Sequence, residues 1–426
     1  MKLIEELTWR GMIHDIMPGT EEQLAKELSS GYVGFDPTAD SLHIGNLVPV
    51  MLLKFLQLSG HKPIALVGGA TGMIGDPSGK SAERQLLSID DINHNLNCQK
   101  KQLEQFLDFD CGENSAEIVN NYDWFKEINL LDFIRDTGKH ITISYMMSKD
   151  SVKSRLESGM SFTEFTYQLI QGYDFLHLYE NMNCKLQMGG SDQWGNIVTG
   201  TELIRRKARG EAFALTAPLI KKADGTKFGK SEGGNIWLDA EKTSPYKFYQ
   251  YWLNSSDEDA ENFIKVFTLF DKETIDKLIA EHKEAPHLRG LQKALAEDIT
   301  IRVHSKEEYE NAVKASEILF KKGQEAVEGL KSLSGSLIKD IFEGVPQATF
   351  NKTDLANGID IVSALVEKGS FLSSNGEARR ELKQNSISVN KQKVNDTCIL
   401  SENDLIGGKY ILLQKGKKNN YLITVE

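Results

Sequence analysis

The chain has 426 residues, 40% hydrophobic and 26% charged, a composition typical of a globular protein with two or three domains. Fibrous and disordered proteins are excluded, and no run of about 18 apolar residues predicts a membrane span. The net charge of -11 argues against a generic nucleic-acid coat, although residues 351–426 carry 11 basic and 9 acidic side chains.

The first residues, MKLIEELTWRG, place acids where a signal peptide would have its apolar stretch, so we expect a cytoplasmic protein. The four cysteines are scattered and form no CxxC pair, which predicts free thiols rather than disulfides or a zinc site. They are Cys98, Cys111, Cys184 and Cys398.

Residues 1–222 alternate short apolar runs rich in β-branched residues with longer amphipathic runs. The runs GYVGF, PIALVGGA, KLQMGG and ALTAPLI predict strands, and VMLLKFLQLSG and FTEFTYQLIQGYDFLHLY predict helices. This order is typical of an α/β domain with a Rossmann-like parallel sheet. Ligands of such a sheet bind beyond the carboxyl ends of its strands.

The stretch FDPTADSLHIGN lies between the first of these strands and the first long helix. Pro49 lacks an N–H group and fits the first turn of that helix, so His43 lies directly before the helix start. Exposed N–H groups and the positive end of the helix dipole would attract a phosphate there. Gly45 allows close approach, and His43 and Asn46 can donate hydrogen bonds. Taken alone, the stretch also fits a helix cap with a structural histidine.

A second cationic motif, KFGKS, occupies residues 227–231. Its two lysines, separated by a glycine, could clamp a polyphosphate, although a solvated basic loop is the alternative interpretation. Two other motifs do not match known catalytic loops. GDPSGKS has Ile74 where a Walker A loop needs glycine, and GGSDQ has Gln193 where a nucleophile elbow needs glycine.

From about Ser244 the strand signals end, and residues 223–325 form a predominantly helical unit with the KFGKS motif at its start. Residues 326–350, with SLSGS and EGVPQATFNKTD, are rich in Gly, Ser and polar side chains and predict a linker. Residues 351–426 alternate again in SISVN, KYILLQ and NYLITV, which predicts a small α+β domain.

Together, HIGN and KFGKS resemble the HIGH and KMSKS signatures of the class I aminoacyl-tRNA synthetases. Six blocks in order are similar to the bacterial tyrosyl-tRNA synthetase family: GFDPTADSLHIG, ALVGGATGMIGDPSGK, SFTEFTYQLIQGYDF, GGSDQWGNI, ADGTKFGKSEGG and KTSPYKFYQYW. GEARRELKQNSISVNKQKV resembles the alpha-L (S-four type) RNA-binding motif of these enzymes. The resemblance implies a Rossmann-like catalytic domain, a helical anticodon-side domain and a small RNA-binding domain.

The resemblance also implies an activity, tyrosine–tRNA ligation in protein biosynthesis. Tyrosine and ATP would give tyrosyl-adenylate and pyrophosphate, and the tyrosine would then be transferred to the 3' end of tRNA. ATP would be a substrate that brings Mg²⁺, without a tightly bound cofactor or a dedicated metal ligand. The family is homodimeric, and residues 132–162 correspond to its interface. Such chemistry rests on alignment and on stabilising phosphate charge.

The resemblance assigns four sets of residues. The catalytic set near the phosphates is Thr38, His43, Asn46, Lys80, Arg84, Lys227, Lys230 and Ser231. The tyrosine set is Tyr32 and Asp174 at the hydroxyl, Asp76, Tyr167 and Gln171 at the ammonium, Gln193 at the carboxyl, and Asp36. The ATP set is Gly34, His43, Gly45, Gly190, Asp192 at the ribose, Leu219 and Ile220 at the adenine, and Lys230. The RNA set is Arg379, Arg380, Lys383, Lys391 and Lys393.

Asn46 departs from the second histidine of HIGH, because it keeps a donor but cannot be charged. Two other functions stay open. One is a related ligase, such as one for tryptophan, against which the pair Tyr32 and Asp174 argues. The other is an RNA-binding protein on a synthetase scaffold without catalysis, against which the intact phosphate-binding groups argue. Taken alone, Asp174 could be a solvated helix acid and the basic tail a solvated face.

Overall fold

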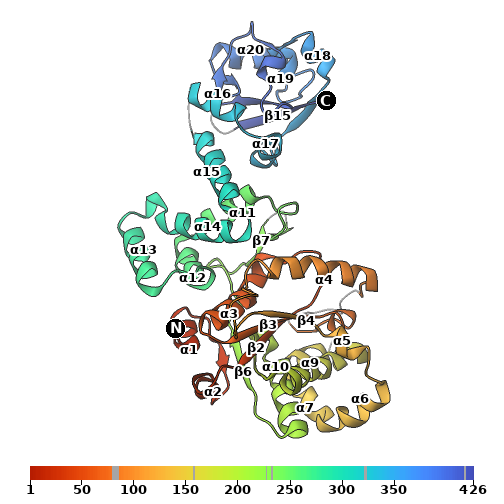
Figure 1. Cartoon of the computed structure of the whole chain (residues 1–426). Helices are drawn as coiled ribbons and strands as arrows, with labels where there is room; N and C mark the ends of the chain where they lie inside the picture. Colours follow the sequence, from red (N-terminus) through yellow and green to blue (C-terminus); the bar gives the residue numbers. More distant parts are fainter. Residues whose placement is uncertain (79–85, 157–158, 227, 232–233, 321–323, 417–418) are drawn as a thin grey trace. The chain divides into compact units, whose positions relative to one another are not determined.

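The computed structural model describes residues 1–426 except 79–85, 157–158, 227, 232–233, 321–323 and 417–418 (Figure 1). The chain forms two compact units, one of residues 1–243 with 252–303 and the other of residues 244–251 with 304–426. Helices of the segment 252–303 therefore pack with the first unit. The finer division of the chain at residues 222, 325 and 350 stays a prediction.

A six-stranded sheet forms the centre of the first unit, with the order β1-β6-β5-β2-β3-β4. Every neighbouring pair is parallel except β1 and β6, which confirms the predicted α/β class. The four predicted strands are present, and β1 and β4 were not predicted. The strands are β1 Asp15–Ile16, β2 Ser30–Phe35, β3 Lys62–Val67, β4 Glu117–Asn120, β5 Cys184–Gly190 and β6 Phe213–Ala217.

Helices cover both faces of this sheet: α3 and α4 lie on one face, and α9 and α10 lie on the other (Figure 1). The strand order reverses between β2 and β5, because β3 and β4 continue to one side and β6 to the other. Such a reversal opens a crevice at the carboxyl ends of the strands. The helices are α3 Leu47–Leu58, α4 Ile89–Leu103, α9 Phe162–Met182 and α10 Trp194–Leu203.

Short elements complete the sheet region. Helices α5 to α8 lie between β4 and α9, and a π-turn continues α10. The bounds are α1 Leu3–Trp9, α2 Thr20–Lys26, η1 Ile44–Asn46, η2 Thr71–Met73, α5 Tyr122–Phe125, α6 Leu130–Asp136, η3 Gly138–His140, α7 Ile143–Met147, α8 Asp150–Leu156, η4 Ser191–Gln193, η5 Ile204–Ala208, β7 Lys230–Ser231 and β8 Gly234–Asn235.

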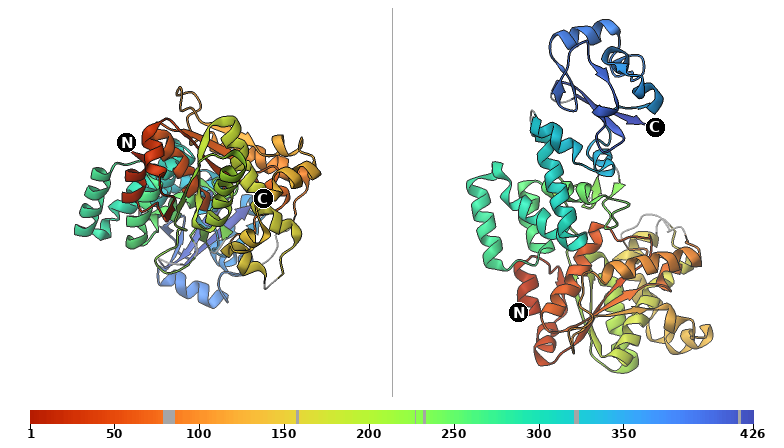
Figure 2. Two further views of the ribbon diagram at one scale, coloured as in Figure 1. Left: turned by 90° about the horizontal axis from the view of Figure 1, so that it is seen from below. Right: turned by 45° about the horizontal axis from the view of Figure 1, so that its top comes forward.

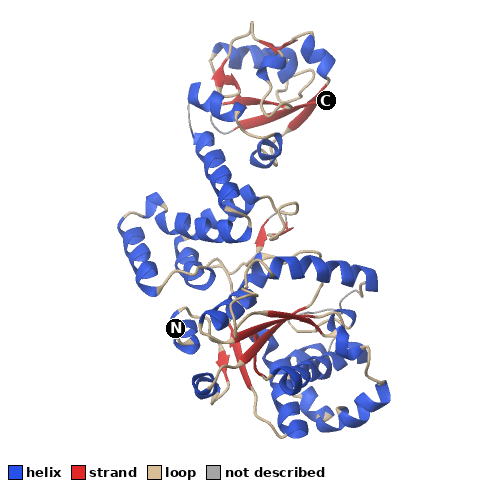
Figure 3. Ribbon diagram, viewed as in Figure 1, coloured by secondary structure: helices blue, strands red, loops and turns tan. Residues whose placement is uncertain are grey.

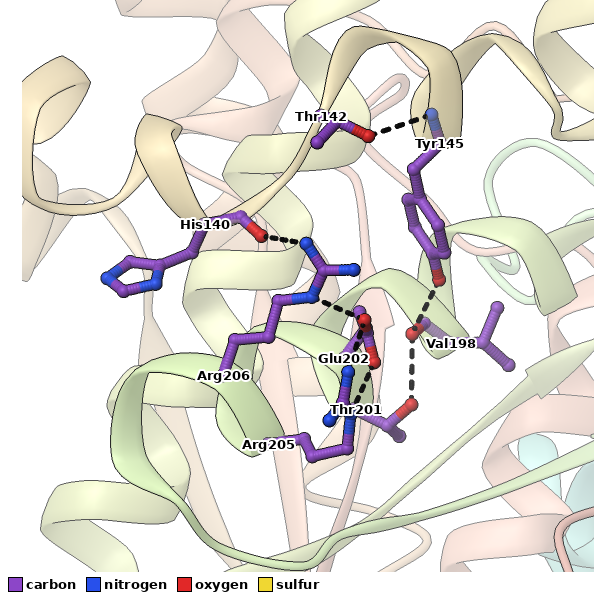
Figure 4. A network of polar contacts seen from close by, with 8 residues as sticks. All are labelled: His140, Thr142, Tyr145, Val198, Thr201, Glu202, Arg205 and Arg206. Atoms are coloured by element: carbon purple, nitrogen blue, oxygen red, sulfur yellow. Dashed lines mark hydrogen bonds and ion pairs between the residues drawn. The ribbon is translucent and has the colours of Figure 1, made fainter.

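Polar contacts hold α7 and η3 against α10 and the π-turn η5 (Figure 4). Tyr145 Oη donates to the Val198 carbonyl oxygen at 3.2 Å, and Arg206 Nη1 donates to the His140 carbonyl oxygen at 2.9 Å. Glu202 accepts from the guanidinium groups of both arginines in η5, and the bond from Arg205 is the main reason that its pKa falls to about 2. The insertion between β4 and α9 is therefore tied to the sheet's own helices.

The segment 252–303 is helical, as predicted (Figure 3). Its core holds the rings of Trp252, Phe263 and Phe267, and Phe228 of the KFGKS motif packs among them, stacked 5.2 Å from the Phe267 ring. The elements of the segment are α12 Asp257–Phe267, α13 Lys272–Glu284, η6 Pro286–Leu288 and α14 Gly290–Val303, and α11 Pro245–Leu253 ends within it.

The second unit contains a five-stranded sheet of order β12-β11-β14-β15-β9, packed with helices α18 to α20 (Figure 2). This confirms a small α+β fold for the tail. The elements are α15 Lys306–Phe320, α16 Gln324–Lys331, α17 Gly335–Ile341, β9 Gln347–Phe350, α18 Lys352–Ala356, β10 Ile359–Asp360, α19 Ile361–Leu365, α20 Asn375–Lys383, β11 Ile387–Val389, β12 Gln392–Lys393, β13 Ile399–Leu400, η7 Glu402–Asp404, β14 Tyr410–Lys415 and β15 Asn419–Val425.

The prediction of a linker over residues 326–350 is wrong as a description of the backbone. The segment holds most of α16, all of α17 and the strand β9, which pairs in parallel with β15. Ser334 belongs to the SLSGS run that suggested a linker, but its Oγ accepts the Leu337 N–H at 3.3 Å and caps α17. Serine favours helix N-termini as strongly as loops, so composition alone could not separate the two.

Long helices are present, but none of those in the described parts of the chain is apolar enough over its length to cross a bilayer.

Candidate active site

The HIGN turn closes directly onto the start of α3, as predicted from Pro49. His43 caps the short helix η1: its Nδ1 accepts the Gly45 N–H at 3.0 Å, and Asn46 Oδ1 accepts the His43 N–H at 3.0 Å. Because Nδ1 is an acceptor, the ring proton of the neutral imidazole lies on Nε2. The histidine therefore both caps the turn and presents an N–H donor.

Gly45 is required by the position of the histidine ring. A Cβ atom at this residue would lie 2.7 Å from His43 Cε1 and 2.9 Å from its Nδ1. Any side chain here would push the imidazole out of its place. Asn46, which replaces the second histidine of HIGH, uses its side-chain oxygen for the cap and retains its amide N–H groups as donors.

The KFGKS motif is described in part. Lys230 and Ser231 form β7, which pairs with β8, and the Lys230 side chain is exposed. Lys227 lies outside the described residues, as do Lys80 and Arg84. Thr38 follows β2 and is exposed. The predicted phosphate roles of these residues stay predictions.

A buried polar pocket lies beside β2. Tyr32 on β2 is 1% exposed, and its hydroxyl has no hydrogen-bond partner in the described part of the chain. Asp174 on α9 is also 1% exposed, and its two carboxyl oxygens accept hydrogen bonds of 3.0 Å from Asn121 Nδ2 and Trp124 Nε1. Gln187, which faces Tyr32 on β5, has a buried side-chain oxygen without a partner among the described residues.

Burial dominates the electrostatics of this pocket. It raises the pKa of Asp174 from 3.8 to about 8, although the bonds from Asn121 and Trp124 oppose the rise. Burial and the neighbouring Asp174 charge also raise the pKa of Tyr32 well above 10. The pocket therefore disfavours uncompensated charge and leaves the Tyr32 hydroxyl and the Gln187 side-chain oxygen without partners among the described residues, which suits a ligand that carries a hydroxyl group.

Acidic groups lie next to this pocket. Asp36 accepts from the Tyr167 hydroxyl and the Thr71 hydroxyl, both at 2.7 Å. Asp76, 8% exposed, accepts from Gln193 Nε2 at 2.7 Å. Burial, followed by the charge of Asp36, raises the pKa of Tyr167 well above 10. Two carboxyl groups in a largely buried site favour a cationic ligand group such as an ammonium.

Gln171 joins this group from α9: its Nε2 donates to Gln193 Oε1 at 3.5 Å, and its own buried Oε1 has no partner within the described ranges. The structure thus gathers the whole predicted tyrosine set, from β2, α9 and the segments around residues 76 and 193.

Most of the predicted ATP set lies at or after the ends of β2, β5 and β6, and Lys230 lies on β7. Gly34 is exposed near the end of β2, and Gly190 ends β5. A Cβ at Gly190 would lie 2.6 Å from Asp192 Oδ1 and 3.2 Å from Leu219 Cδ2, so only glycine leaves this rim open. Leu219 is 53% exposed, and Ile220 beside it is partly exposed. Two apolar side chains at a strand end suit a flat heterocycle, although their contact with adenine stays a prediction.

The comparisons with known proteins agree with this geometry. A model of the family described as tRNA synthetases class I (W and Y) matches residues 25–321. The chain belongs to this family. A second model, the tyrosine–tRNA ligase SYY-like C-terminal domain, matches residues 337–423.

Similar members of the class I synthetases include bacterial and fungal proteins. A tyrosine–tRNA ligase of Flavobacterium johnsoniae is 63% identical over 429 residues and 99% of both chains. One of Bacteroides fragilis is 60% identical over 432 residues and 100% of both chains. The crystal structure of a C-terminally truncated mitochondrial tyrosyl-tRNA synthetase of Aspergillus nidulans has a TM-score of 0.67 and 30% identity, over 75% of this chain and 94% of that chain.

Three pocket residues of this class I synthetase were missed by sequence reasoning: Asn121, Trp124 and Gln187. Gln187 offered a signal, because a glutamine in the middle of an apolar strand needs a polar partner. Asn121 and Trp124 follow β4, which was not predicted, so their approach to Asp174 had no sequence signal.

The predicted RNA residues lie in the second unit. Arg379, Arg380 and Lys383 are exposed on α20, and Lys393 is exposed on β12. Lys391 differs: it is half-buried, its Nζ donates to the Ile318 carbonyl oxygen at 3.2 Å, and burial lowers its pKa. Lys383 and Lys393 line one open surface hollow of about 390 Å³. The RNA contacts of all five stay predictions.

Proposed function

We propose that the protein is a tyrosine–tRNA ligase, which activates tyrosine with ATP and transfers it to tRNA. The observation that carries the proposal is the buried Tyr32 hydroxyl without a partner in the described chain, next to the Asp174 carboxyl. A phenol supplies both a donor and an acceptor to such a pair. Phenylalanine would leave the Tyr32 hydroxyl unpaired and offer Asp174 no donor in a dry pocket, and that penalty is what excludes it.

The amino acid would bind with its ring on the β2 side of the pocket and its ammonium near Asp76, Tyr167 and Gln171. Gln193, already bonded to Asp76, would then lie by the carboxyl group. Tryptophan has no hydroxyl group for Tyr32 and Asp174, so the pocket chemistry also argues against a tryptophan–tRNA ligase.

Activation consists of attack by the tyrosine carboxylate oxygen on the α-phosphorus of ATP, with pyrophosphate as the leaving group. His43 would donate from Nε2 to phosphate oxygens as charge develops, and Lys230 would approach from the KFGKS side. Mg²⁺ would arrive bound to ATP. The described residues include no cluster of three or more His, Cys, Asp or Glu side chains that could hold a metal ion.

A homodimer is proposed on the apolar surface of the insertion between β4 and α9. Five large apolar side chains there are exposed by 55% to 80%: Leu130, Leu131, Ile134, Ile143 and Phe162. Exposed apolar side chains of this size mark interfaces where they gather in one patch. The exposed basic side chains of α20 and β12 would contact tRNA phosphates, and the cytoplasm is the proposed compartment.

ATP–pyrophosphate exchange with each of the twenty amino acids tests the activity. We expect exchange with tyrosine alone; exchange with tryptophan, or none at all, would refute it. Lys230→Ala should slow adenylate formation far more than it weakens tyrosine binding, because the charge that it meets develops at the phosphates. Equal losses would contradict this role.

Sedimentation tests the dimer. Leu131→Asp should convert the dimer to a monomer, whereas Leu288→Asp, at a similarly exposed leucine away from this surface, should leave it intact. A monomeric unaltered protein would refute the interface.

A further inference from the structure

The segment that follows the KFGKS motif is paired with the HIGN turn. His43 and Trp237 form an isolated antiparallel bridge. The hydrogen bonds that flank the pair, donated by the N–H groups of Ile44 and Leu238, are 2.9 and 2.8 Å long. In this type of pair the two facing residues exchange no hydrogen bond with each other, and their side chains lie on the same face at the shortest cross-strand distance.

The two side chains are in contact through their rings. The rings of His43 and Trp237 have centroids 6.0 Å apart and planes inclined by 68°, an edge-to-face arrangement. The imidazole is therefore held from several directions. Gly45 supplies the N–H bonded to Nδ1 and the surface against Cε1, and Trp237 supplies an aromatic neighbour from the other chain segment.

Trp237 is itself fixed by contacts that return to the HIGN turn. Its backbone N–H donates to Thr243 Oγ1 at 3.0 Å. Lys242 Nζ lies 5.7 Å from the centroid of the indole ring and 2.9 Å from Asp40 Oδ1. Asp40 precedes His43 by three residues. Lys242 therefore links the segment of Trp237 to the segment of His43 a second time, in addition to the bridge itself.

The same two segments share a third set of contacts, centred on Ser41. Its Oγ accepts the Asp239 N–H at 3.2 Å and a bond from Gln102 Nε2 at 3.0 Å. Gln102 Oε1 in turn accepts the Leu42 N–H at 2.8 Å. Residues 40–46 and 236–243 therefore form one hydrogen-bonded body that α4 supports.

We propose that Trp237 is a positioning residue for His43, which keeps the Nε2 donor of the imidazole directed at the phosphate charge during adenylate formation. The inference rests on the proposed function. Trp237 acts through the imidazole, since among the described residues its ring contacts that of His43 and the Lys242 ammonium. A displacement of about 1 Å in a catalytic group can cost about a hundredfold in rate, so a loosened imidazole is costly.

The test uses the full-length protein and separates binding from rate. Trp237→Leu removes the ring, and Trp237→Phe retains an aromatic edge. We expect Trp237→Leu to slow tyrosyl-adenylate formation about tenfold or more, with Kd for tyrosine and ATP changed by less than about twofold. Trp237→Phe should recover most of the rate. Trp9→Leu, in α1, is the matched control and should leave the rate unchanged.

A double-mutant cycle decides between positioning and general damage. In a His43→Ala background, Trp237→Leu should cause no further loss, because the group it positions is gone. An equal loss in both backgrounds, or a loss in Kd alone, would overturn the proposal. If the Trp237→Leu protein does not fold, Lys242→Met replaces it in the cycle. We expect Lys242→Met to slow adenylate formation less than Trp237→Leu would, and only when His43 is present.

The exchange assay distinguishes a wrong role for Trp237 from a wrong enzymatic activity. Absence of tyrosine-dependent exchange in the unaltered protein would refute the ligase itself. Normal exchange combined with additive losses would refute only the role of Trp237.

Discussion

Asp174→Asn is expected to make the ligand-free protein more resistant to unfolding at alkaline pH while it removes the selection of tyrosine. Burial raises the pKa of Asp174 from 3.8 to about 8. A carboxyl group whose pKa is higher in the folded state holds its proton more tightly there. Its contribution is complete below pH 3.8 and is lost as the pH rises through about 8. At about 1.4 kcal/mol per unit, the whole shift corresponds to about 6 kcal/mol.

The measurable part lies between pH 6 and pH 8. Over this interval the unfolded carboxyl is already ionised, whereas the folded one passes from protonated to about half-ionised. Linkage then gives a loss of about 2 kcal/mol in the wild-type protein. Asparagine does not titrate, so the difference in unfolding free energy between Asp174→Asn and wild type should grow by that amount.

Urea unfolding at pH 6, 7 and 8 measures the difference. The relevant transition is the one that added tyrosine shifts in the wild-type protein, because ligand binding stabilises the part that holds the pocket. Asp123→Asn, at an exposed acid one residue from Trp124, is the control and should give a difference independent of pH. If the difference in unfolding free energy between Asp174→Asn and wild type does not change with pH, the raised pKa of Asp174 is refuted.

Three further outcomes are expected. Gly45→Ala places a Cβ 2.7 Å from His43 Cε1 and should slow adenylate formation about tenfold to a hundredfold in stopped-flow assays, with tyrosine Kd unchanged. A matching loss of tyrosine binding would contradict this. Arg379→Glu with Arg380→Glu should weaken tRNA binding and lower its salt slope by about 2, leaving pyrophosphate exchange intact; an unchanged slope would refute phosphate contact. Truncation after Gly344 should preserve ATP–pyrophosphate exchange and impair tRNA charging. Normal charging would contradict a role of the C-terminal residues in tRNA binding.

Much of the sheet could be predicted because its inner strands are predominantly apolar and buried. β3 and β5 are bounded by glycine-rich turns and covered by helices on both faces, which is the pattern that periodicity detects. β4 escaped prediction because it is an edge strand of four half-buried residues that include a glutamate and an asparagine. Such a strand owes its conformation to its pairing with β3, not to its own composition.

In the candidate site, too, features set by local sequence could be predicted, whereas contacts set by rotamers or by distant residues could not. The position of His43 before α3 followed from Pro49, a local constraint. The bond from Gly45 N–H to the imidazole depends on a rotamer and could not be read from spacing. Trp124 reaches Asp174 across 50 residues of sequence, so only the assembled fold brings donor and acceptor together.

The reversal of strand order between β2 and β5 separates the two groups of residues proposed for ATP and for the amino acid. The turn proposed to bind phosphate belongs to the loop that leaves β2 and enters α3, whereas the groups proposed to contact the amino-acid side chain come largely from α9 and the residues after β4. Replacing the residues proposed for the amino acid need not disturb the nucleotide chemistry. One scaffold can thereby serve different amino acids, which accounts for a single family model that spans both tyrosine and tryptophan enzymes.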